Sequence, residues 1–231
     1  MKTDTTNLLV SVHMPVFNGE KTIEKALRSL RLQTHENWEA IVVNDGSADR
    51  TREIVQSVSD ERIRLIDLPE NRGRAYARQV ALENSTGDFI AYLDCDDFYH
   101  PKKLERQLDY FSKNEKSVFC GCGIGSLDVD GSLRRVRSKK TISSQTFSIG
   151  DPFPCAPAVS MIRAEIAQLG SYDPAMRLAE DTDYFLKILD GRQFGAVCEL
   201  LYFYAEYESV TIAKIIKSYL YTLKAAPKYV S

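Results

Sequence analysis

Apolar runs of strand length alternate with amphipathic segments through the first half of this 231-residue chain, and this alternation predicts an α/β fold. Unbroken apolar runs indicate parallel strands, because such strands are buried on both faces of their sheet. The segments between them place apolar residues three and four apart, which is the spacing of one helical face. We therefore expect a Rossmann-like, mostly parallel sheet that is flanked by helices and has right-handed crossovers.

Each predicted strand in this half is followed by a predicted helix. The first strand is the apolar run from Leu8 to Pro15, and its helix begins near Glu20 after an Asn-Gly turn. The lone His13 is expected to be packed or hydrogen-bonded within that strand. The predicted strands span residues 8–15, 38–43, 63–68 and 89–93, and the helices begin near residues 20, 47, 74 and 101.

The second half of the chain shows a pattern that favours antiparallel pairing. Strands at 118–127 and 133–136 flank Asp130-Gly131, a turn sequence that predicts a hairpin. Further strands are expected at 158–162 and 194–204, with helices near 166 and at 178–189. These elements predict a smaller antiparallel sheet in this half of the chain. The basic segment at 134–140 fits either a solvated loop or a segment that meets an anionic ligand.

No linker divides the chain, so we expect one domain over residues 1–210 and a C-terminal amphipathic helix over 211–231. Within the domain, the change in strand pattern separates a half at about 8–115 from a half at about 116–210. The final helix carries an apolar stripe backed by lysines. It fits either a helix that packs on the domain or one that makes peripheral contact with an anionic membrane.

Composition narrows the class of protein. The 30 Lys and Arg against 32 Asp and Glu give a formal charge of −2, so no general nucleic-acid binder is expected. No stretch approaches the roughly 20 apolar residues of a membrane span. The N-terminus lacks the apolar segment of a signal peptide, and we expect a soluble, cytoplasmic protein. The 5 cysteines include no Cys-x-x-Cys pair, which argues against a disulfide framework and a thiolate zinc site.

The apolar run at 89–93 leads directly into Asp94-Cys95-Asp96-Asp97. Crowded carboxylates repel one another unless a cation or hydrogen-bond donors offset their charge. Open α/β sheets also place their ligands at the carboxyl ends of strands, so we predict a metal-binding site here. Two further Asp-x-Asp copies have simpler explanations: the copy at 128–130 fits a turn, and the copy at 181–183 fits the first turn of a helix.

Four other residues have two interpretations each. Asp45 ends the second strand and fits either a turn or an acceptor for the imide N–H of uracil or thymine. Arg74 and Arg78 lie one helical turn apart and fit either surface charges or partners of a diphosphate or a base. Asp181 shares a helical face with residues that should be buried, and it fits either a helix cap or a general base.

Five short stretches of the chain form an ordered set of motifs: Ser11–Glu20, Val43–Ser47, Asn71–Arg78, Gly87–Asp97 and Glu180-Asp181. In this order they make the chain resemble the family 2 glycosyltransferases with the A-type (GT-A) nucleotide-sugar fold, over about residues 8–205. Each stretch is weak alone, and the shared order carries the resemblance. The chain departs from the family at Arg177-Leu178-Ala179, where a glycine-rich approach is frequent.

The resemblance implies a role for each matching residue. Asp45 is similar to the acid that recognises the pyrimidine base, Asp94 to the acid that contacts the ribose, and Asp96 to the ligand of Mg²⁺ or Mn²⁺. Asp181 resembles the catalytic base. Cys95 is not expected to act as a nucleophile, because neighbouring carboxylates raise the pKa of its thiol. The remaining nucleotide-binding candidates are Pro15, Phe17, Glu20, Arg74, Arg78 and Cys95.

The function that the resemblance implies is inverting, metal-dependent transfer of a sugar from a nucleoside-diphosphate sugar, with a UDP-sugar first, to a hydroxyl group. The acceptor would be a saccharide or a lipid-linked saccharide in cell-surface polysaccharide or glycoconjugate synthesis. One displacement assisted by a base suffices for inversion, so no carboxylate nucleophile is needed.

Two alternatives stay open at this point. A catalytically inactive protein could bind the nucleotide sugar, because binding and turnover use different acids. A sugar nucleotidyltransferase would share the sheet and the acidic metal ligands. It needs, however, a glycine- and arginine-rich loop after the first strand, which Met14–Gly19 does not supply. A dehalogenase-type phosphatase is disfavoured, because Phe98 stands where its Asp-x-Asp-x-Thr motif has threonine.

Overall fold

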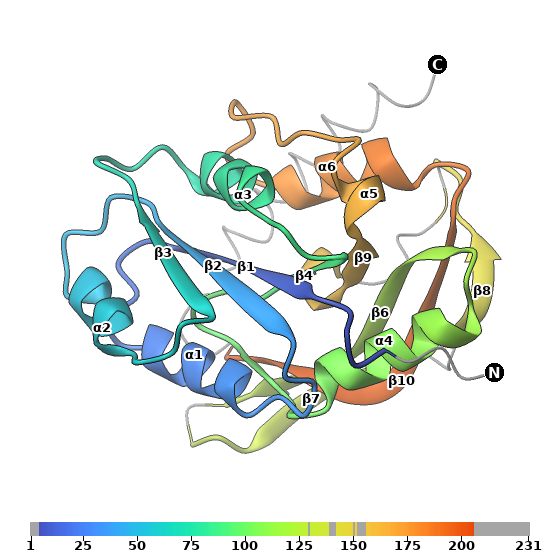
Figure 1. The fold of residues 1–231 in the computed structure, drawn as a ribbon, viewed down its shortest axis with the longest axis horizontal. Coiled ribbons are helices and arrows are strands. Elements are labelled where there is room, and N and C mark those ends of the chain that lie inside the picture. The colour runs from blue at the N-terminus through green and yellow to red at the C-terminus, as the bar shows by residue number, and fades with distance from the viewer. Residues whose placement is uncertain (1–4, 129, 139–141, 150, 152–155, 206–231) are drawn as a thin grey trace.

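The computed structural model of the chain describes residues 5–128, 130–138, 142–149, 151 and 156–205. In these residues the strands form one continuous mixed sheet, and helices cover both of its faces (Figure 1). The strand order along the sheet is β3-β2-β1-β4-β9-β6-β10-β5, with β7 paired to β6 and β8 paired to β10. This arrangement confirms the predicted α/β fold class.

The first half of the chain forms the parallel part of the sheet. β1 (Val10–Val16) lies between β2 (Trp38–Asn44) and β4 (Phe89–Tyr92), and β3 (Ile63–Asp67) pairs with the outer side of β2. Because these neighbours are parallel, a helix must carry the chain back after each of the first three strands. Those helices are α1 (Ile23–Arg31), α2 (Thr51–Ser57) and α3 (Arg74–Glu83).

Pro15 lies within β1 because of how that strand ends. β1 pairs with β4 only as far as His13, whereas it pairs with β2 as far as Val16. The carbonyl of His13 accepts the N–H of Leu93, so alternate residues from His13 onward point to the β4 side. The missing N–H of Pro15 therefore faces a side where the ladder has already ended, and proline costs no sheet hydrogen bond there.

The second half continues the same sheet with several antiparallel pairs. β9 (Met161–Arg163) joins the two parts, since it pairs antiparallel with both β4 and β6 (Ser117–Leu127). β10 (Gln193–Tyr204) runs parallel to β6. β5 (Phe98–Tyr99) and β8 (Ile142–Thr146) pair antiparallel with β10, and β7 (Leu133–Arg137) pairs antiparallel with β6. The predicted antiparallel strands are thus present, but they extend the parallel sheet instead of forming a separate one.

Alternate residues of the central strands enter different cores. Val12 and Met14 of β1 pack in a cluster with residues of α1 and α4 (Lys103–Lys113). Ile90 and Tyr92 of β4 pack in a second cluster with residues of α6 (Glu180–Leu189) and α5 (Ala164–Ala167). Figure 1 shows α3, α5 and α6 on one side of the sheet and α1, α2 and α4 on the other. Burial on both faces explains why these strands are continuous apolar runs.

Several smaller predictions can be compared with the structure. Asp130 and Gly131 lie in the turn that joins β6 to β7, as predicted, and Gly131 N donates a hydrogen bond to Asp128 O at 2.9 Å. Cys120 and Cys122 of β6 are buried. The basic residues at 134–137 lie on β7, which confirms the strand predicted at 133–136 and does not fit the loop interpretation for these residues. The helix predicted at 211–231 lies outside the described residues. Within the described part of the chain, no helix is long and apolar enough to cross a membrane.

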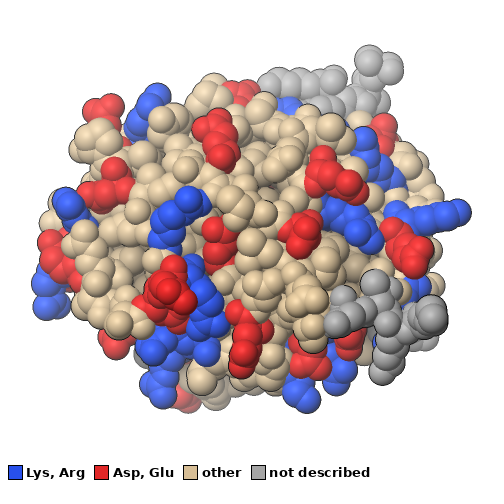
Figure 2. Space-filling model, in the orientation of Figure 1, with Lys and Arg blue, Asp and Glu red and all other residues tan. Residues whose placement is uncertain are grey.

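The surface seen in Figure 2 carries acidic and basic side chains side by side. This mixture agrees with the formal charge of −2. The face in view therefore presents no extended basic surface of the kind that binds nucleic acid.

Candidate active site

Three neighbouring parallel strands deliver the predicted site residues to one edge of the sheet. β4 leads into Asp94-Cys95-Asp96-Asp97, β1 leads into Phe17, and β2 leads into Asp45. Leu93 is buried, and the chain becomes partly exposed at Asp94. Because ligands of open α/β sheets bind outside the carboxyl ends of the strands, the topology alone brings these residues to one place.

Asp97 is the enclosed member of the acidic stretch, with 3% of its surface exposed. Its carboxylate accepts hydrogen bonds from the Tyr202 hydroxyl (2.8 Å) and from Ala205 N (3.0 Å). The Tyr202 hydroxyl in turn accepts a hydrogen bond from Asp94 N (3.2 Å). Burial, together with the charges of Asp94 and Asp96, raises the pKa of Asp97. Asp97 thus ties the acidic stretch to the end of β10.

Arg78 of α3 connects this strand end to α6. Its side chain is 3% exposed, and its Nη2 lies 3.2 Å from Asp94 Oδ1. Its Nη1 lies 3.2 Å from Glu180 Oε1 and 3.6 Å from Asp181 Oδ2. One buried guanidinium group therefore contacts carboxylates from two distant segments of the chain. We call this arrangement of Arg78, Asp94, Glu180 and Asp181 the Arg78 bridge.

The carboxylates of the bridge keep both nearby arginines charged. Burial alone would lower the pKa of Arg78, but Asp94, Glu180 and Asp181 raise it well above its ordinary value. Burial and the charge of Arg78 would likewise lower the pKa of Arg74. The same carboxylates outweigh both effects and raise it. The predicted pair Arg74 and Arg78 is thus part of a charged network, in which Arg78 is buried and Arg74 is partly exposed.

Asp181 lies at the partly exposed side of the bridge, with 24% of its side chain exposed. Its Oδ1 accepts a hydrogen bond from Thr182 N (2.7 Å), and its Oδ2 faces Arg78. The neighbouring acids Glu180 and Asp183 are buried. A carboxylate that reaches solvent while its backbone is held in a helix can accept a proton from a bound hydroxyl group. The geometry therefore leaves both predicted uses open, as a helix-start acid and as a base.

Asp45 holds the loop that follows β3. It is 3% exposed, and its two carboxylate oxygens accept hydrogen bonds from Arg72 N (2.8 Å) and Gly73 N (2.9 Å). A Cβ atom on Gly46 would lie 2.4 Å from the carbonyl carbon of Glu70, so this glycine lets the loop pack against the end of β2. Each carboxylate oxygen has a further lone pair. Contact of Asp45 with a base stays a prediction.

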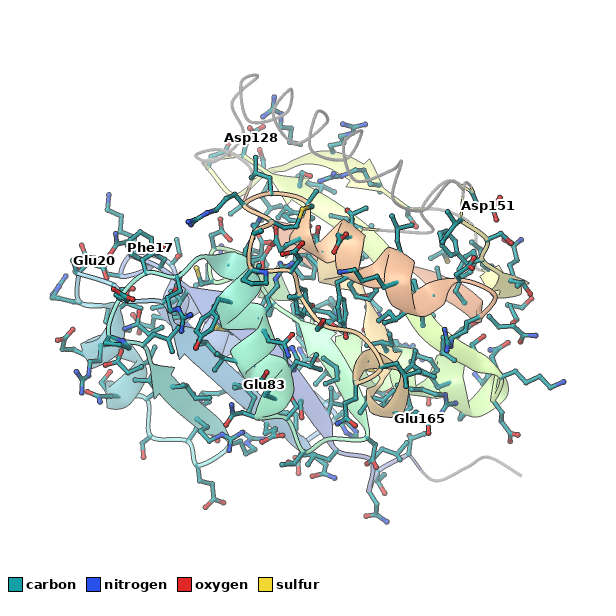
Figure 3. All side chains as sticks on the ribbon, turned by 90° about the horizontal axis from the view of Figure 1, so that it is seen from above. Phe17, Glu20, Glu83, Asp128, Asp151 and Glu165 are labelled. Carbon is teal, nitrogen blue, oxygen red and sulfur yellow. The ribbon has the colours of Figure 1, made fainter. Side chains whose placement is uncertain are left out.

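Phe17 and Glu20 lie beside each other in the connection between β1 and α1 (Figure 3). Phe17 is 48% exposed at the end of β1, so its ring is accessible to a ligand there. Glu20 has a protein partner, because its Oε2 accepts a hydrogen bond from Arg50 N (3.2 Å) and lies 3.3 Å from Arg50 Nε. Pro15 is partly buried on β1. Their predicted contacts with a nucleotide stay predictions.

Cys95 faces the turn that follows β1. A Cβ atom on Gly19 would lie 3.5 Å from Cys95 Sγ, which places the thiol directly under that turn. Burial, followed by the charges of Asp96, Asp94 and Asp97, raises the pKa of Cys95 to about 12. The thiol therefore stays protonated at neutral pH. This agrees with the prediction that Cys95 is not a nucleophile.

Comparison with known proteins decides the family. The family model described as "Glycosyl transferase family 2" matches residues 11–168, which is more than half of the chain. This chain belongs to glycosyl transferase family 2. The matched residues run from β1 to the end of α5, so they include the acidic stretch after β4, and α6 with Asp181 lies beyond them.

Curated relatives include WfgD from Escherichia coli, named as UDP-Glc:alpha-D-GlcNAc-diphosphoundecaprenol beta-1,3-glucosyltransferase. It is 43% identical over 113 residues, which cover 49% of this chain and 45% of WfgD. An uncharacterized glycosyltransferase from Haemophilus influenzae is 35% identical over 148 residues, which cover 63% of this chain and 59% of that protein. The family 2 chain described here thus spans about half the length of these relatives.

Among solved structures, TarS from S. aureus in complex with UDP-GlcNAc superimposes with a TM-score of 0.78 at 20% identity. The match covers 94% of this chain and 65% of TarS. At this level of identity the comparison establishes the fold, and the family 2 chain has the GT-A fold that was expected.

The acidic stretch Asp94–Asp97 offers carboxylate oxygens, which are ligands that a hard divalent cation binds. Asp94 is paired with Arg78, and Asp97 is enclosed by Tyr202 and Ala205. Asp96, between them, is a partly exposed carboxylate. Across the described residues, no group of three or more His, Cys, Asp or Glu side chains could hold a metal ion alone. A hard cation that is bound with substrate phosphates needs only one or two protein carboxylates. The residues present therefore suit a cation that arrives with a diphosphate.

Two site residues were given no role by the sequence. Tyr202 links Asp94 to Asp97 from β10, more than one hundred positions further along the chain. Glu180 pairs with two arginines of α3. The adjacent Asp181 pointed to the right helix, but the burial of Glu180 has no local signal. Of the acids at the start of α6, Asp181 and the preceding Glu180 therefore contact Arg78.

Proposed function

We propose that this chain is the catalytic part of an inverting, metal-dependent glycosyltransferase. It would move a sugar from a UDP-sugar to a hydroxyl group of a saccharide or of a lipid-linked saccharide. Membership of glycosyl transferase family 2 supports a glycosyl transfer reaction. Inversion, the metal, the donor and the acceptor are the parts that the proposal adds.

The Arg78 bridge is the observation that carries the proposal. It holds Asp94, at the strand end where a nucleotide would lie, and Asp181, on α6, against one guanidinium group. Both acids are partly exposed, at 23% and 24% of their side chains. An inverting transfer needs a donor site and a base close together, with a hydroxyl group between them.

Each residue then has a distinct task. Asp181 takes the proton of the acceptor hydroxyl while that oxygen attacks the anomeric carbon. The bond from that carbon to the diphosphate oxygen breaks, and the configuration inverts in one displacement. Asp94 binds the ribose, and Asp45 with the 72–73 backbone borders the base. Phe17 and Cys95 line the same strand ends.

Asp96 would hold Mg²⁺ or Mn²⁺ together with the diphosphate oxygens. A cation in that position supplies positive charge that stabilises the departing nucleoside diphosphate. The buried Arg78 and the partly exposed Arg74 add fixed positive charge nearby, since the pKa values of both are raised.

The names of similar proteins favour a UDP-sugar and a lipid-linked acceptor. TarS was solved with UDP-GlcNAc, and the name of WfgD specifies UDP-Glc and a diphosphoundecaprenol-linked sugar. A role in cell-surface polysaccharide or glycoconjugate synthesis follows if the acceptor here is of that class. The cytoplasmic location, and peripheral membrane contact through 211–231, stay predictions from the sequence.

The decisive experiment incubates the chain with UDP-glucose, UDP-GlcNAc, dTDP-glucose or GDP-mannose, in Mn²⁺ or in EDTA, and measures release of the nucleoside diphosphate. We expect release from a UDP-sugar in Mn²⁺ and loss of that release in EDTA. Proton NMR of the freed sugar should show the inverted anomer first.

Other outcomes of this experiment favour the alternatives. A retained anomer would exclude the single displacement. Donor binding without release, measured by thermal shift, would favour a catalytically inactive nucleotide-sugar binder. When pyrophosphate is added to the same incubation, formation of a nucleoside triphosphate from the UDP-sugar would favour a sugar nucleotidyltransferase.

A further inference from the structure

Glu180 is a fully buried acid, with 0% of its side chain exposed. An enclosed carboxylate is costly unless it is paired and hydrogen-bonded. Glu180 is paired across an interface between two helices, since it begins α6 and both its partners lie on α3. Its Oε2 accepts a hydrogen bond from Arg74, and its Oε1 has ion-pair contacts alone among the described residues. The proposed reaction gives Glu180 no task, so its burial needs another explanation.

Arg74 holds Glu180 with two contacts. Its Nε lies 2.5 Å from Glu180 Oε1, and its Nη2 donates to Glu180 Oε2 at 3.3 Å. Such a two-point contact fixes the plane of the carboxylate as well as its position. Arg74 is 47% exposed, so the pair is closed on the protein side and open towards solvent only through Arg74.

Arg78 approaches the same carboxylate from inside the protein. Its Nη1 is shared between Glu180 Oε1 at 3.2 Å and Asp181 Oδ2 at 3.6 Å. Glu180 therefore takes part of the attraction that Arg78 would otherwise direct entirely at Asp181 and Asp94. The position of the Arg78 guanidinium group between the two acids depends on this third carboxylate.

The backbone makes Asp181 follow Glu180. Ala179, which precedes α6, has a left-handed conformation with φ of 58°, so the chain turns sharply just before the helix begins. Once Glu180 is fixed by α3, the direction of Asp181 is set by one peptide unit and by its own hydrogen bond from Thr182 N. A shift of the first turn of α6 would move Asp181 with it.

We propose that Glu180 is a positioning residue, which docks the first turn of α6 on Arg74 and Arg78 and thereby places Asp181 opposite the donor site. This inference rests on the proposed function, in which Asp181 is the base. In this role Glu180 contacts neither substrate and acts by holding Asp181 in position.

Asp183 provides a matched control. It is also a buried acid of α6, 1% exposed, and it lies 2.5 Å from Lys187 of the same helix. Removing its charge changes the helix as removing that of Glu180 does, but Asp183 contacts neither Arg74 nor Arg78 in the ion pairs of the described residues. If the reaction depends on the Arg78 bridge, neutralising Glu180 should therefore slow it, and neutralising Asp183 should not.

The experiment compares wild type with Glu180→Gln, Glu180→Asp and Asp183→Asn, using UDP release from a UDP-sugar in Mn²⁺. We expect Glu180→Gln to lower kcat about 10- to 100-fold, because a misplaced base costs rate without removing donor contacts. The KM for the donor should change less than about threefold. Glu180→Asp keeps the charge and should recover part of the lost kcat, and Asp183→Asn should keep the wild-type kcat per folded molecule.

Hydrogen exchange at residues 180–184 tests the same inference without catalysis. Exchange should be about tenfold faster in Glu180→Gln than in Asp183→Asn if Glu180 docks the helix start. Equal exchange rates and equal kcat values in the two variants would overturn the inference. Absence of UDP release by wild type would overturn the proposed function, and the exchange comparison would still decide the docking.

Glu180→Asp keeps the test decisive if Glu180→Gln does not fold. A lower kcat with unchanged thermal stability supports positioning, because the shorter side chain retains the charge but not the reach. A wild-type kcat in this variant overturns it.

Discussion

The acids that follow β4 and the acids that begin α6 lie on opposite sides of Arg78, and both groups are divided in the same way. Asp97 and Glu180 are enclosed and paired within the protein. Asp94 and Asp181 are partly exposed, at 23% and 24% of their side chains. In each group, one acid holds the local structure while a neighbour is left towards solvent. Burial, and not the Asp-x-Asp spacing, separates the two uses.

The hairpin copy at Asp128 supports this conclusion. Its side chain is 47% exposed, and its one ion pair among the described residues is with Arg134 at 3.8 Å. Figure 3 shows Asp128 apart from Phe17 and Glu20. Among the described residues, Asp128 has no buried acid beside it and no ion pair with Arg78, so this copy has the spacing of a site without its surroundings.

Asp181→Asn should give the largest effect, because it removes the proposed base from the α6 group alone. We expect UDP release to fall about 10²- to 10⁴-fold. UDP affinity should stay within about threefold of wild type, because the acids after β4 are unchanged. The measurements are steady-state release and calorimetry with UDP and Mn²⁺.

Asp190→Asn, just beyond the end of α6, is the control for Asp181→Asn. Asp190 accepts a hydrogen bond from Ile149 N and lies outside the Arg78 bridge, so its variant should release UDP at the wild-type rate. A fully active Asp181→Asn would show that the base has been assigned to the wrong group.

Arg78→Met should separate the two groups and cost the most stability. It leaves Glu180 buried beside Arg74 alone, and breaking a buried ion pair in this way costs about 3–5 kcal/mol. Arg74→Met is the comparison, because the Arg74 side chain is 47% exposed and Arg78 would still face Glu180. Urea unfolding of both variants gives the difference. If the two losses were equal, Arg78 would not be the main link.

Much of the first half of the chain could be predicted from the sequence, because its central strands are buried on both faces and each strand is joined to the next by a helix. The place of Asp94–Asp97 was predictable for the same reason, since the end of a buried strand is visible as the end of an apolar run. β5 escaped prediction because it has two residues, and β8 because Ile142–Thr146 is rich in Ser and Thr.

The Arg78 bridge could be predicted only in part. Local spacing placed Arg74 and Arg78 on one side of α3, and the Glu-Asp pair marked the start of α6. Their contacts join residues more than one hundred positions apart, as in the hydrogen bond from Arg74 to Glu180. Which acid is enclosed depends on how α6 packs against α3, and a single sequence carries no local signal for that packing.

The buried His13 of β1 should make the free energy of unfolding depend on pH. Ser85 Oγ donates to Ala81 O at 2.7 Å, so its one proton is used and His13 Nε2 must donate to Ser85 at 2.6 Å. His13 Nδ1 is buried without a hydrogen-bond partner in the described part of the chain. Burial, and then the charge of Arg78, lower the pKa of His13 to about 3. Tyr92, whose ring lies edge-on to His13 at 5.4 Å, is uncharged at neutral pH because burial raises its pKa.

The sign of the effect follows from the lowered pKa. The unfolded chain binds a proton at His13 below about pH 6.5, whereas the folded chain resists it down to about pH 3. Stability is therefore lost as the pH falls from about 6.5, and His13 accounts for about 2 kcal/mol of loss between pH 7.5 and pH 5.

His13→Gln retains a donor for Ser85 without titrating, and it should remove that part of the pH dependence. Urea unfolding at the two pH values measures the loss. His100→Gln, at a partly buried position before α4, should leave the loss as large as in wild type. An equal loss in His13→Gln and wild type would exclude His13 as the source.

The smallest expected effect is on UDP binding in Asp96→Ala, compared with Asp128→Ala. The two variants change the same Asp-x-Asp motif in two different surroundings. Mn²⁺ should strengthen UDP binding by wild type about tenfold, because a cation on Asp96 and the diphosphate adds one charged contact to each partner. Asp96→Ala should bind UDP equally with Mn²⁺ or EDTA, whereas Asp128→Ala should keep the full gain. Calorimetry measures all three proteins. If Asp96→Ala kept the Mn²⁺ gain, the cation would be held by another acid of the stretch. Asp94 would then be the first to test, since moving Arg78 wholly onto Glu180 and Asp181 would release its carboxylate.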